Sequence, residues 1–417
     1  MDRFQPVILG GDIGAYALAR ELHEAFGVRS LLVTAHNPRA IQDSAILERH
    51  EFVHADEDSP LANELIRLAK QHYQAHPNVP LLLLANTDWR IDALSKHRDA
   101  LERYYAMPMP HRHTIARVMN KEGFEAIART VGMQVPATLY QDFSNADSPD
   151  WAPEPLPDEM SFPIVAKPAD SSKYEHLQFA GRQKVYRIDD ADELNQLWMT
   201  LRDAGFTDTF LAQQLIPGDD TAMYSVTAYV DQHRHVTMIC SAQVLLEEHH
   251  PAMLGNPCAM ITTPIPELLE PAKRFLESID YHGFANFDVK RDPRTGEFYF
   301  LEVNPRIGRN SYYCVGAGIN PMEVMVADVF DGAELPEQVA ARESLYTIIP
   351  WLLLRKYIVD KALRSRVRRL IFTTKVVNPL RNPHDSALRR RKHRIGTEIG
   401  LAKRFREYYP KPTSTGF

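Results

Sequence analysis

Short apolar runs alternate with helical periodicity at the start of the chain, and this alternation limits the class of fold that the segment can adopt. Residues 6–9 form one apolar run, and residues 15–26 have the periodicity of a helix. Residues 30–34 (SLLVT) and 80–84 (PLLLL) form further apolar runs. Buried strands that alternate with helices are typical of an open parallel sheet. We therefore expect an α/β domain first.

Three glycines follow the first of these runs. Gly10, Gly11 and Gly14 lie where a dinucleotide-binding fingerprint would stand, but their spacing does not match G-x-G-x-x-G. No acidic residue clearly occupies the position of a ribose ligand. We interpret the three glycines as a tight turn between a strand and a helix.

The second half of the chain has a different pattern, in which neighbouring apolar runs are joined by short turns. Residues 223–230 precede 235–244, and residues 284–290 precede 297–303. Each pair predicts two antiparallel strands in a hairpin. The fold class expected is therefore α/β at the start and α+β after it.

The length of the chain predicts more than one domain, because 417 residues exceed what one hydrophobic core usually organises. The hydrophobic share of 44% and the charged share of 24% argue against wholesale disorder. No apolar run reaches the roughly 18–20 residues that span a bilayer. Residues 1–6 lack the features of a signal peptide, and three separated cysteines suit a reducing compartment. We expect a cytoplasmic enzyme.

The net charge of −6 hides a basic C-terminal end. Lys and Arg crowd together from residue 355 onward, above all in residues 389–394 (RRRKHR). Residues 351–370 mix apolar residues with many cations, which suits a solvated amphipathic helix, a surface for an anionic substrate, or a helix on a membrane surface. The sequence has no recognised nucleic-acid-binding motif, and we expect no nucleic acid partner.

Polar residues interrupt the last two apolar runs. Asp288 lies in the first (NFDVK), and Glu302 and Asn304 lie in the second (FLEVNPR). Residues two apart in a strand face the same side, so Glu302 and Asn304 share a face that Asp288 can join. Two carboxylates and an amide oxygen suit Mg²⁺ bound with nucleotide phosphates, whereas an ordinary polar hairpin is the alternative. Arg306 can place its guanidinium beside them for a phosphoryl or carboxylate oxygen.

The order of several short elements resembles the ATP-grasp superfamily. These elements are Lys121, Lys167-Pro168, a hinge at residues 213–220, Asp288 and Glu302-x-Asn304. The resemblance covers about residues 1–330, and its specificity lies in order and spacing. The chain has no G-x-x-x-x-G-K-[ST] sequence, which excludes a P-loop.

The resemblance implies a division into three segments. Residues 1–115 would form a Rossmann-like domain, and residues 116–330 would form a two-lobed ATP-grasp domain. A lid loop is expected at about residues 170–185 of that domain. Residues 331–417 would form a basic, helical C-terminal extension.

Carried over residue by residue, the resemblance also implies an ATP site. It gives Lys121 and Lys167 as phosphate-binding lysines, with Lys167 acting in catalysis too. A lysine lying along the surface is the alternative for each. The hinge supplies the other nucleotide contacts that the resemblance implies, with Gln213 in place of the family's usual acid: Gln213, Gln214, Ile216 and Asp220.

The loop after Lys167 points to one subfamily within the ATP-grasp superfamily. Its sequence, SSKYEH followed by FAGRQKVY, resembles the long basic loop of the D-aspartate ligases, which make cell-wall cross-bridges in some Gram-positive bacteria. Ser172 and Lys184 are then expected to contact the γ-phosphate when the lid closes. The turn after the last strand gives the residues expected to bind the carboxylate substrate: Arg306, Arg309, Asn310 and Ser311.

The function that the resemblance implies is an ATP-dependent carboxylate–amine ligase with ATP and two Mg²⁺ ions as cofactors. A carboxylate attacks the γ-phosphorus, an amine attacks the resulting acylphosphate, and Arg306 stabilises charge in both steps. The sharpest version joins D-aspartate to an amine of a nucleotide- or lipid-linked peptidoglycan precursor. Peripheral membrane contact through the basic end and a homo-oligomer are compatible with it.

Two other functions stay open. One is another amino-acid or dipeptide ligase of the same superfamily, and the other is a non-catalytic nucleotide-binding protein with a basic tail for a membrane or polyanion. The complete set of Mg²⁺ ligands favours catalysis. Residues 247–250 (EEHH) look like a metal cluster, but neighbouring residues cannot all face one ion, so we expect a solvated loop there. We interpret residues 312–314 (YYC) as core packing.

Overall fold

A parallel five-stranded sheet begins the fold, as the sequence predicts. The computed structural model describes residues 3–169, 174, 177–183, 185–373 and 376–413. The strand order is β3-β2-β1-β4-β5. The strands are β1 (Gln5–Leu9), β2 (Ser30–Thr34), β3 (Leu47–Glu51), β4 (Leu81–Ala85) and β5 (Tyr105–Ala106). The helices of this domain are α1 (Ile13–Phe26), α2 (Asp58–Ala75), α3 (Asp88–Lys96) and α4 (Arg98–Leu101).

Gly10 and Gly11 lie in the predicted turn after β1, and Gly14 lies in the first turn of α1. Asp12 caps α1, because its carboxylate accepts a hydrogen bond from the backbone N–H of Ala15 at 2.8 Å. A Cβ atom at Gly14 would lie 2.3 Å from the Asn86 side chain and 2.7 Å from that of Arg309. Only glycine therefore allows α1 to approach the segment that carries Arg309.

An antiparallel four-stranded sheet forms a small lobe, with the strand order β6-β9-β7-β8. Its strands are β6 (Thr138–Asp142), β7 (Ile164–Pro168), β8 (Tyr186–Ile188) and β9 (Thr209–Gln214). Helix α8 (Ala191–Asp203) covers this sheet, since its fully buried Trp198 packs edge-on against Phe210 of β9. Helices α5 (Arg112–Met119) and α6 (Lys121–Thr130) lead from the first domain into the lobe.

A large sheet occupies the centre, in the order β14-β13-β10-β11-β12-β16-β17, with β15 beside β11. Both predicted hairpins are confirmed, because β10 pairs antiparallel with β11 and β13 with β14. The strands are β10 (Met223–Val230), β11 (Val236–Glu248), β12 (Asn256–Thr262), β13 (Gly283–Arg291), β14 (Phe298–Asn304), β15 (Gln338–Val339), β16 (Ser344–Thr347) and β17 (Val376–Val377). The helical elements are η1 (Asp220–Ala222), η2 (Pro251–Met253), α9 (Pro266–Glu277), α10 (Tyr312–Ala317) and α11 (Pro321–Asp331).

The basic C-terminal end is helical, as expected, but it packs closely on the rest of the chain. Its elements are α12 (Trp351–Tyr357), α13 (Lys361–Thr373), η3 (Pro383–Asp385) and α14 (Leu388–Tyr408). The expectation of one continuous helix over residues 351–370 is wrong. A new helix begins after Asp360, whose carboxylate accepts a hydrogen bond from the Leu363 N–H as a cap does.

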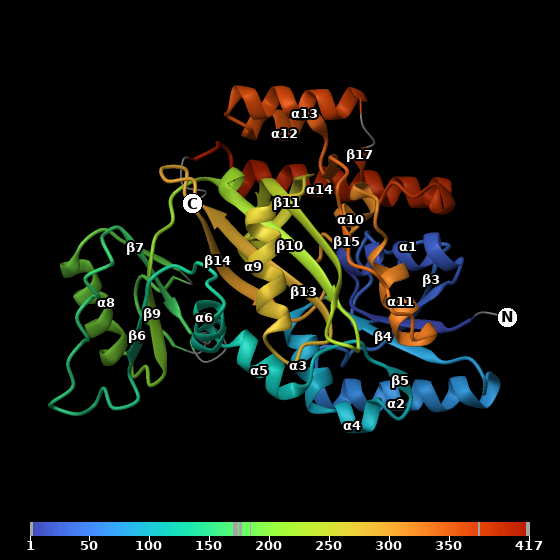
Figure 1. Ribbon diagram of the computed structural model, residues 1–417, viewed down its shortest axis with the longest axis horizontal. Coiled ribbons are helices and arrows are strands. Elements are labelled where there is room, and N and C mark those ends of the chain that lie inside the picture. Colours follow the sequence, from blue (N-terminus) through green and yellow to red (C-terminus); the bar gives the residue numbers. More distant parts are fainter. Residues whose placement is uncertain (1–2, 170–173, 175–176, 184, 374–375, 414–417) are drawn as a thin grey trace.

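The layers of the molecule can be followed in Figure 1. The small lobe (green) lies on one side of the large sheet and the parallel sheet (blue) on the other, while α12 and α13 form the outer edge at the top. One buried apolar cluster extends from α1 through the large sheet to Phe405 of α14. Among the described residues, no helix has both the length and the apolar character needed to cross a membrane.

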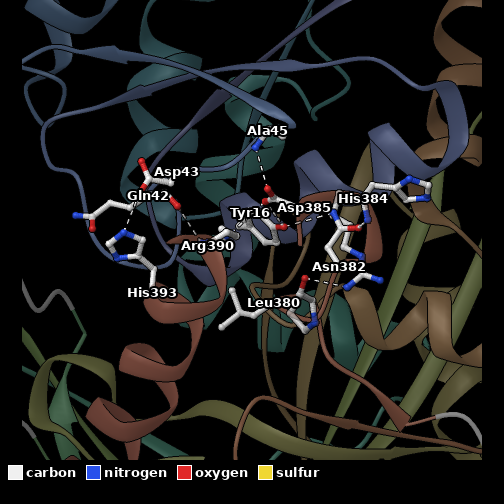
Figure 2. Close-up of polar contacts among 12 residues, drawn as sticks. Tyr16, Gln42, Asp43, Ala45, Leu380, Asn382, His384, Asp385, Arg390 and His393 are labelled. Atoms are coloured by element: carbon white, nitrogen blue, oxygen red, sulfur yellow. Dashed lines mark hydrogen bonds and ion pairs between the residues drawn. The ribbon is translucent and has the colours of Figure 1, made fainter. Parts of the chain in front are cut away.

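A buried polar cluster anchors α14 on the first domain (Figure 2). Arg390, only 1% exposed, donates from Nε to Asp385 at 3.1 Å and from Nη1 to the carbonyl oxygen of Arg39 at 3.2 Å. The Asp385 carboxylate also accepts hydrogen bonds from the Tyr16 hydroxyl and the Ala45 backbone N–H, both at 2.8 Å. The start of α14 is therefore held by groups far away in the sequence.

Candidate active site

Strands β13 and β14 bring the predicted metal-binding residues together. Asp288 is directly opposite Glu302, and Asn286 is opposite Asn304. Side chains of directly opposite residues in an antiparallel pair lie on one face. Asn304 donates from Nδ2 to Asp288 Oδ2 at 3.2 Å, and all three predicted ligands line one cavity.

The electrostatics of this group favour a bound cation. Burial and the neighbouring Glu302 carboxylate raise the pKa of Asp288. Desolvation would also raise the pKa of Glu302, but the ammonium groups of Lys121 and Lys167 outweigh it and lower that pKa. A hard cation would relieve the repulsion between the two carboxylates. Among the described residues, no group of three His, Cys, Asp or Glu could hold an ion, and the oxygens that this group offers are those of the two carboxylates and the Asn304 amide.

The two predicted phosphate-binding lysines approach the same group from different elements. Lys121 begins α6, and its Nζ atom lies 2.6 Å from the Leu301 carbonyl oxygen and 3.3 Å from Glu302 Oε2. Lys167 comes from β7 of the small lobe. Burial and the nearby Lys121 ammonium lower the pKa of Lys167 to about 8. Two ammonium groups that repel each other are suited to a polyanion between them.

The predicted adenine-binding hinge lies at the end of β9. Gln213 is buried and donates from Nε2 to the Thr138 hydroxyl at 3.0 Å. The Gln214 carboxamide is bonded to both backbone groups of Ser161. Ile216 is buried as well. Because the protein already occupies both carboxamides, adenine would have to be bound by backbone groups of this segment.

Asp220, the predicted ribose ligand, is buried at the start of η1. Its Oδ2 atom accepts hydrogen bonds from the Glu247 backbone N–H and contacts His249 Nε2, each at 2.9 Å. Burial, then the carboxylates of Asp220 and Asp288, raise the pKa of Glu247 to about 8. Glu247 therefore lies within the electrostatic influence of two predicted site residues, Asp220 and Asp288, although the sequence placed residues 247–250 in a solvated loop.

The expectation of a solvated loop at residues 247–250 is wrong. Strand β11 extends through Glu248, which is buried and forms an ion pair with Arg404 at 2.5 Å. The His249 ring stacks on that of Tyr409, with centroids 3.6 Å apart. The acidic and imidazole side chains are covered by α14 and the residue after it, which lie some 150 residues further along the chain, so no local pattern could predict their burial.

Arg306 and Arg309 connect the large sheet to the first domain. Arg306 forms a bidentate pair with Asp88 at the start of α3, with N–O distances of 2.9 and 3.1 Å. Arg309 Nε donates to Asp12, the cap of α1, and its Nη1 atom lies 3.8 Å from Glu248. Both guanidinium groups line the cavity. Each is thus held in place where a carboxylate substrate could reach it.

The remaining predicted substrate-binding and lid residues lie outside the cavity or outside the described part of the chain. Asn310 and Ser311 are buried, and Ser311 donates to Glu21 of α1 at 2.8 Å. Neither residue lines the large cavity. The two predicted lid residues, Ser172 and Lys184, lie outside the described residues.

A cavity of about 930 Å³ lies where the first domain, the large sheet and α14 meet. Its lining includes Asp12, Asp88, Asp288, Glu302, Arg306 and Arg404. Asp12 and Asp88 follow β1 and β4, and ligands of open parallel sheets bind beyond the carboxyl ends of their strands. That rule could have indicated both residues. The contribution of α14 had no such signal.

Comparison with known proteins agrees with this geometry. The ATP-grasp domain family matches residues 137–309. D-aspartate ligase of Enterococcus faecium is 32% identical over 327 residues, which cover 78% of this chain and 77% of that protein. The chain belongs to the ATP-grasp ligases. It is therefore an enzyme that forms C–N bonds with release of ADP.

Solved structures support the fold of this ATP-grasp ligase. L-amino acid ligase from Bacillus licheniformis matches with a TM-score of 0.51 and 18% identity, over 79% of this chain and 75% of that one. The biotin carboxylase domain of Hydrogenobacter thermophilus 2-oxoglutarate carboxylase, in complex with MgADP, matches with a TM-score of 0.57 and 13% identity, over 83% and 74%. The predicted combination of a parallel-sheet domain with an ATP-grasp fold is confirmed.

Proposed function

We propose that this ATP-grasp ligase joins the carboxylate of D-aspartate to an amine of a peptidoglycan precursor. The observation that carries the reaction is the meeting of Asp288 and Glu302 with the ammonium groups of Lys121 and Lys167 at the edge of the cavity. The choice of substrate rests on the 32% identity to D-aspartate ligase.

ATP would lie between the small lobe and the large sheet in this proposal. Lys121 and Lys167 would bind its terminal phosphates, and the oxygens of Asp288, Glu302 and Asn304 would hold Mg²⁺, with two ions as the proposed number. Mg²⁺, when bound, neutralises phosphate oxygens and makes the γ-phosphorus easier to attack. The remaining nucleotide contacts that we propose come from the lid and the hinge: Ser172, Lys184, Gln213, Gln214, Ile216 and Asp220.

The chemistry has two balanced steps. A carboxylate oxygen of the donor attacks the γ-phosphorus, the bond from that phosphorus to the bridging oxygen breaks, and ADP leaves. The amine nitrogen then attacks the acylphosphate carbonyl carbon, the C–N bond forms, and phosphate leaves as the nitrogen loses a proton. Arg306, oriented by Asp88, would bind the donor carboxylate and stabilise the negative charge that develops in both steps. Arg309 would bind the second carboxylate of the donor.

A screen for phosphate release tests the proposal. The purified chain is incubated with ATP and Mg²⁺, with D- and L-amino acids as donors, and with UDP-linked wall peptides as acceptors. We expect release only with D-aspartate plus a peptide that contains a free lysine amine, and a product heavier by one aspartyl group in mass spectrometry. Release with other amino acids or dipeptides instead would favour another ligase of the superfamily. Nucleotide binding without release under any combination would favour a non-catalytic protein.

The outer surface of α12 and α13 supports a second part of the proposal, in which the ligase contacts an anionic membrane surface. Leu352, Val359 and Phe372 have exposed fractions of 77%, 60% and 76%. Lys361, Arg368 and Phe372 are spaced by seven and four residues along α13, which places them on one face. Exposed apolar side chains among cations are typical of a helix on an anionic lipid surface.

Sedimentation with lipid vesicles tests this contact. We expect the chain to bind vesicles of phosphatidylglycerol and not of phosphatidylcholine, and to lose binding when Leu352→Ser and Phe372→Ser are combined. Ile399→Ser, which changes an exposed isoleucine of α14, is the matched control. Equal binding to both lipids, or no effect of the double substitution, would contradict the proposed surface.

The proposal also places the ligase in the cytoplasm, where its three buried free thiols would stay reduced. The division into residues 1–115, 116–330 and 331–417 is kept as the proposed domain organisation. The last of these segments supplies part of the cavity wall.

A further inference from the structure

Helix α14 continues from its anchor into the wall of the active-site cavity. The anchor residue Arg390 lies in its first turn, and Gly396, Thr397, Gly400 and Arg404 follow along the helix. These four residues line the same 930 Å³ cavity as the predicted metal ligands. Positions 396, 400 and 404 are one turn apart, so they belong to one face of α14.

Two glycines on this face are unfavourable for the helix itself. Glycine in a helix interior costs up to about 1 kcal/mol relative to alanine. A Cβ atom at Gly400 would have no heavy atom within 4 Å, so no packing of the protein requires glycine there. At Gly396 a Cβ atom would meet the Arg39 guanidinium at 2.9 Å. The space kept free at Gly400 opens into the cavity.

The position of the cavity indicates which substrate would use this space. The phosphates are expected next to Lys121 and Lys167, and the donor carboxylate next to Arg306. Binding pockets for small molecules have volumes of roughly 300–1,000 Å³, so the 930 Å³ cavity has room for a second substrate beside one amino acid. The part of the cavity lined by α14 carries none of the proposed metal ligands or phosphate-binding lysines, and it is the part left for that second substrate.

We propose that α14 forms the subsite for the amine acceptor, and that Gly400 sets the size of acceptor that fits. The inference rests on the proposed function. An acceptor of peptide chemistry suits the wall, because peptide groups can bond to a hydroxyl oxygen and to guanidinium N–H groups. The Thr397 hydroxyl donates to the His393 carbonyl oxygen and keeps its acceptor lone pairs, and Arg404, whose Nη1 pairs with Glu248, has further N–H groups.

A single accessible thiol tests the subsite directly. All three native cysteines are buried and should not react with maleimide, so Gly400→Cys places a single reactive thiol in the cavity. Ile399→Cys places one at the neighbouring exposed position and serves as the control. The probe is maleimide labelling in the presence of a non-hydrolysable ATP analogue, D-aspartate and a UDP-linked, lysine-containing pentapeptide.

We expect the peptide, at about ten times its dissociation constant, to slow the labelling of residue 400 about tenfold, because only the free fraction reacts. The ATP analogue and D-aspartate alone should not slow it, and residue 399 should label at one rate throughout. A second variant, Gly400→Leu, should raise the KM of the pentapeptide at least tenfold, with less effect on free L-lysine and none on ATP.

The possible failures can be told apart. Turnover by the wild-type chain without protection of residue 400 would overturn the acceptor subsite alone. Protection of residue 400 by D-aspartate without the peptide would assign this wall to the donor and overturn the inference. A wild-type chain that releases no phosphate with any amine would overturn the ligase proposal and the subsite together.

Discussion

Replacing Asp385 with alanine removes the carboxylate that anchors α14, and we expect the free energy of unfolding to fall by about 3–5 kcal/mol. Three donors lose their acceptor: Arg390 Nε at 3.1 Å, the Tyr16 hydroxyl at 2.8 Å and the Ala45 N–H at 2.8 Å. A buried donor without a partner costs about 1–3 kcal/mol, and a charged one costs more. Arg390 is 1% exposed, so water cannot replace the lost partner.

Urea unfolding followed by circular dichroism measures this loss. Asp385→Ala and Arg390→Met are compared singly and together, because removing both charges leaves no buried charge unpaired. The double variant should therefore lose less stability than the sum of the single variants. Arg381→Ala is the control, since Arg381 lies 3.4 Å from Glu398 and its side chain is 55% exposed, so this pair should contribute less than about 1 kcal/mol.

Two results would contradict a stabilising role of this anchor. A loss below about 1 kcal/mol for Asp385→Ala would show that the buried pair is not needed to hold α14. Strictly additive losses in the double variant would show that Asp385 and Arg390 do not stabilise each other in the folded protein.

Four further predictions follow from individual residues. Asp288→Asn and Glu302→Gln should each lower ADP release at least about 100-fold with unchanged circular dichroism, because they remove proposed Mg²⁺ ligands; unchanged turnover would remove them from the mechanism. The KM for ATP should rise as the pH passes about 8, where Lys167 loses its charge, and Lys167→Arg should flatten that profile. Burial raises the pKa of Glu21 to about 8, from about 4.5 in the unfolded chain, so the ionised side chain lowers the free energy of unfolding progressively between pH 4.5 and pH 8 and by a constant amount above pH 8. Glu21→Gln should therefore raise the free energy of unfolding more at pH 9 than at pH 5. An equal effect at both pH values would contradict this. Gly400→Ala should raise the free energy of unfolding by about 1 kcal/mol in urea, and a loss would show that its Cβ does not have open space.

The parts of the fold that the sequence predicted are those with a local signal. The two hairpins are predicted from neighbouring apolar runs joined by short turns, and β10 begins and ends at the residues expected. Asp288 and Glu302 could be placed opposite each other because a hairpin fixes which residues pair across it. The break after Tyr357 was missed, because residues 351–370 keep a helical pattern of apolar residues while the cap that starts a second helix is a single aspartate.

The part of the cavity wall that α14 forms could not be predicted from the sequence, because it depends on contacts between residues far apart in the chain. The Tyr16 hydroxyl and the Asp385 carboxylate that hold it are 369 positions apart in the chain. Each of the residues concerned is ordinary in its own neighbourhood: an arginine in a basic run, an aspartate before a helix, a tyrosine on a helix face. Their burial depends on the fold bringing the start of α14 against α1, where the Arg390 guanidinium lies 4.4 Å from the centroid of the Tyr16 ring. A basic segment that looks like a solvated tail in sequence can thus complete an active-site cavity, because charge patterns report what a segment carries and not what covers it.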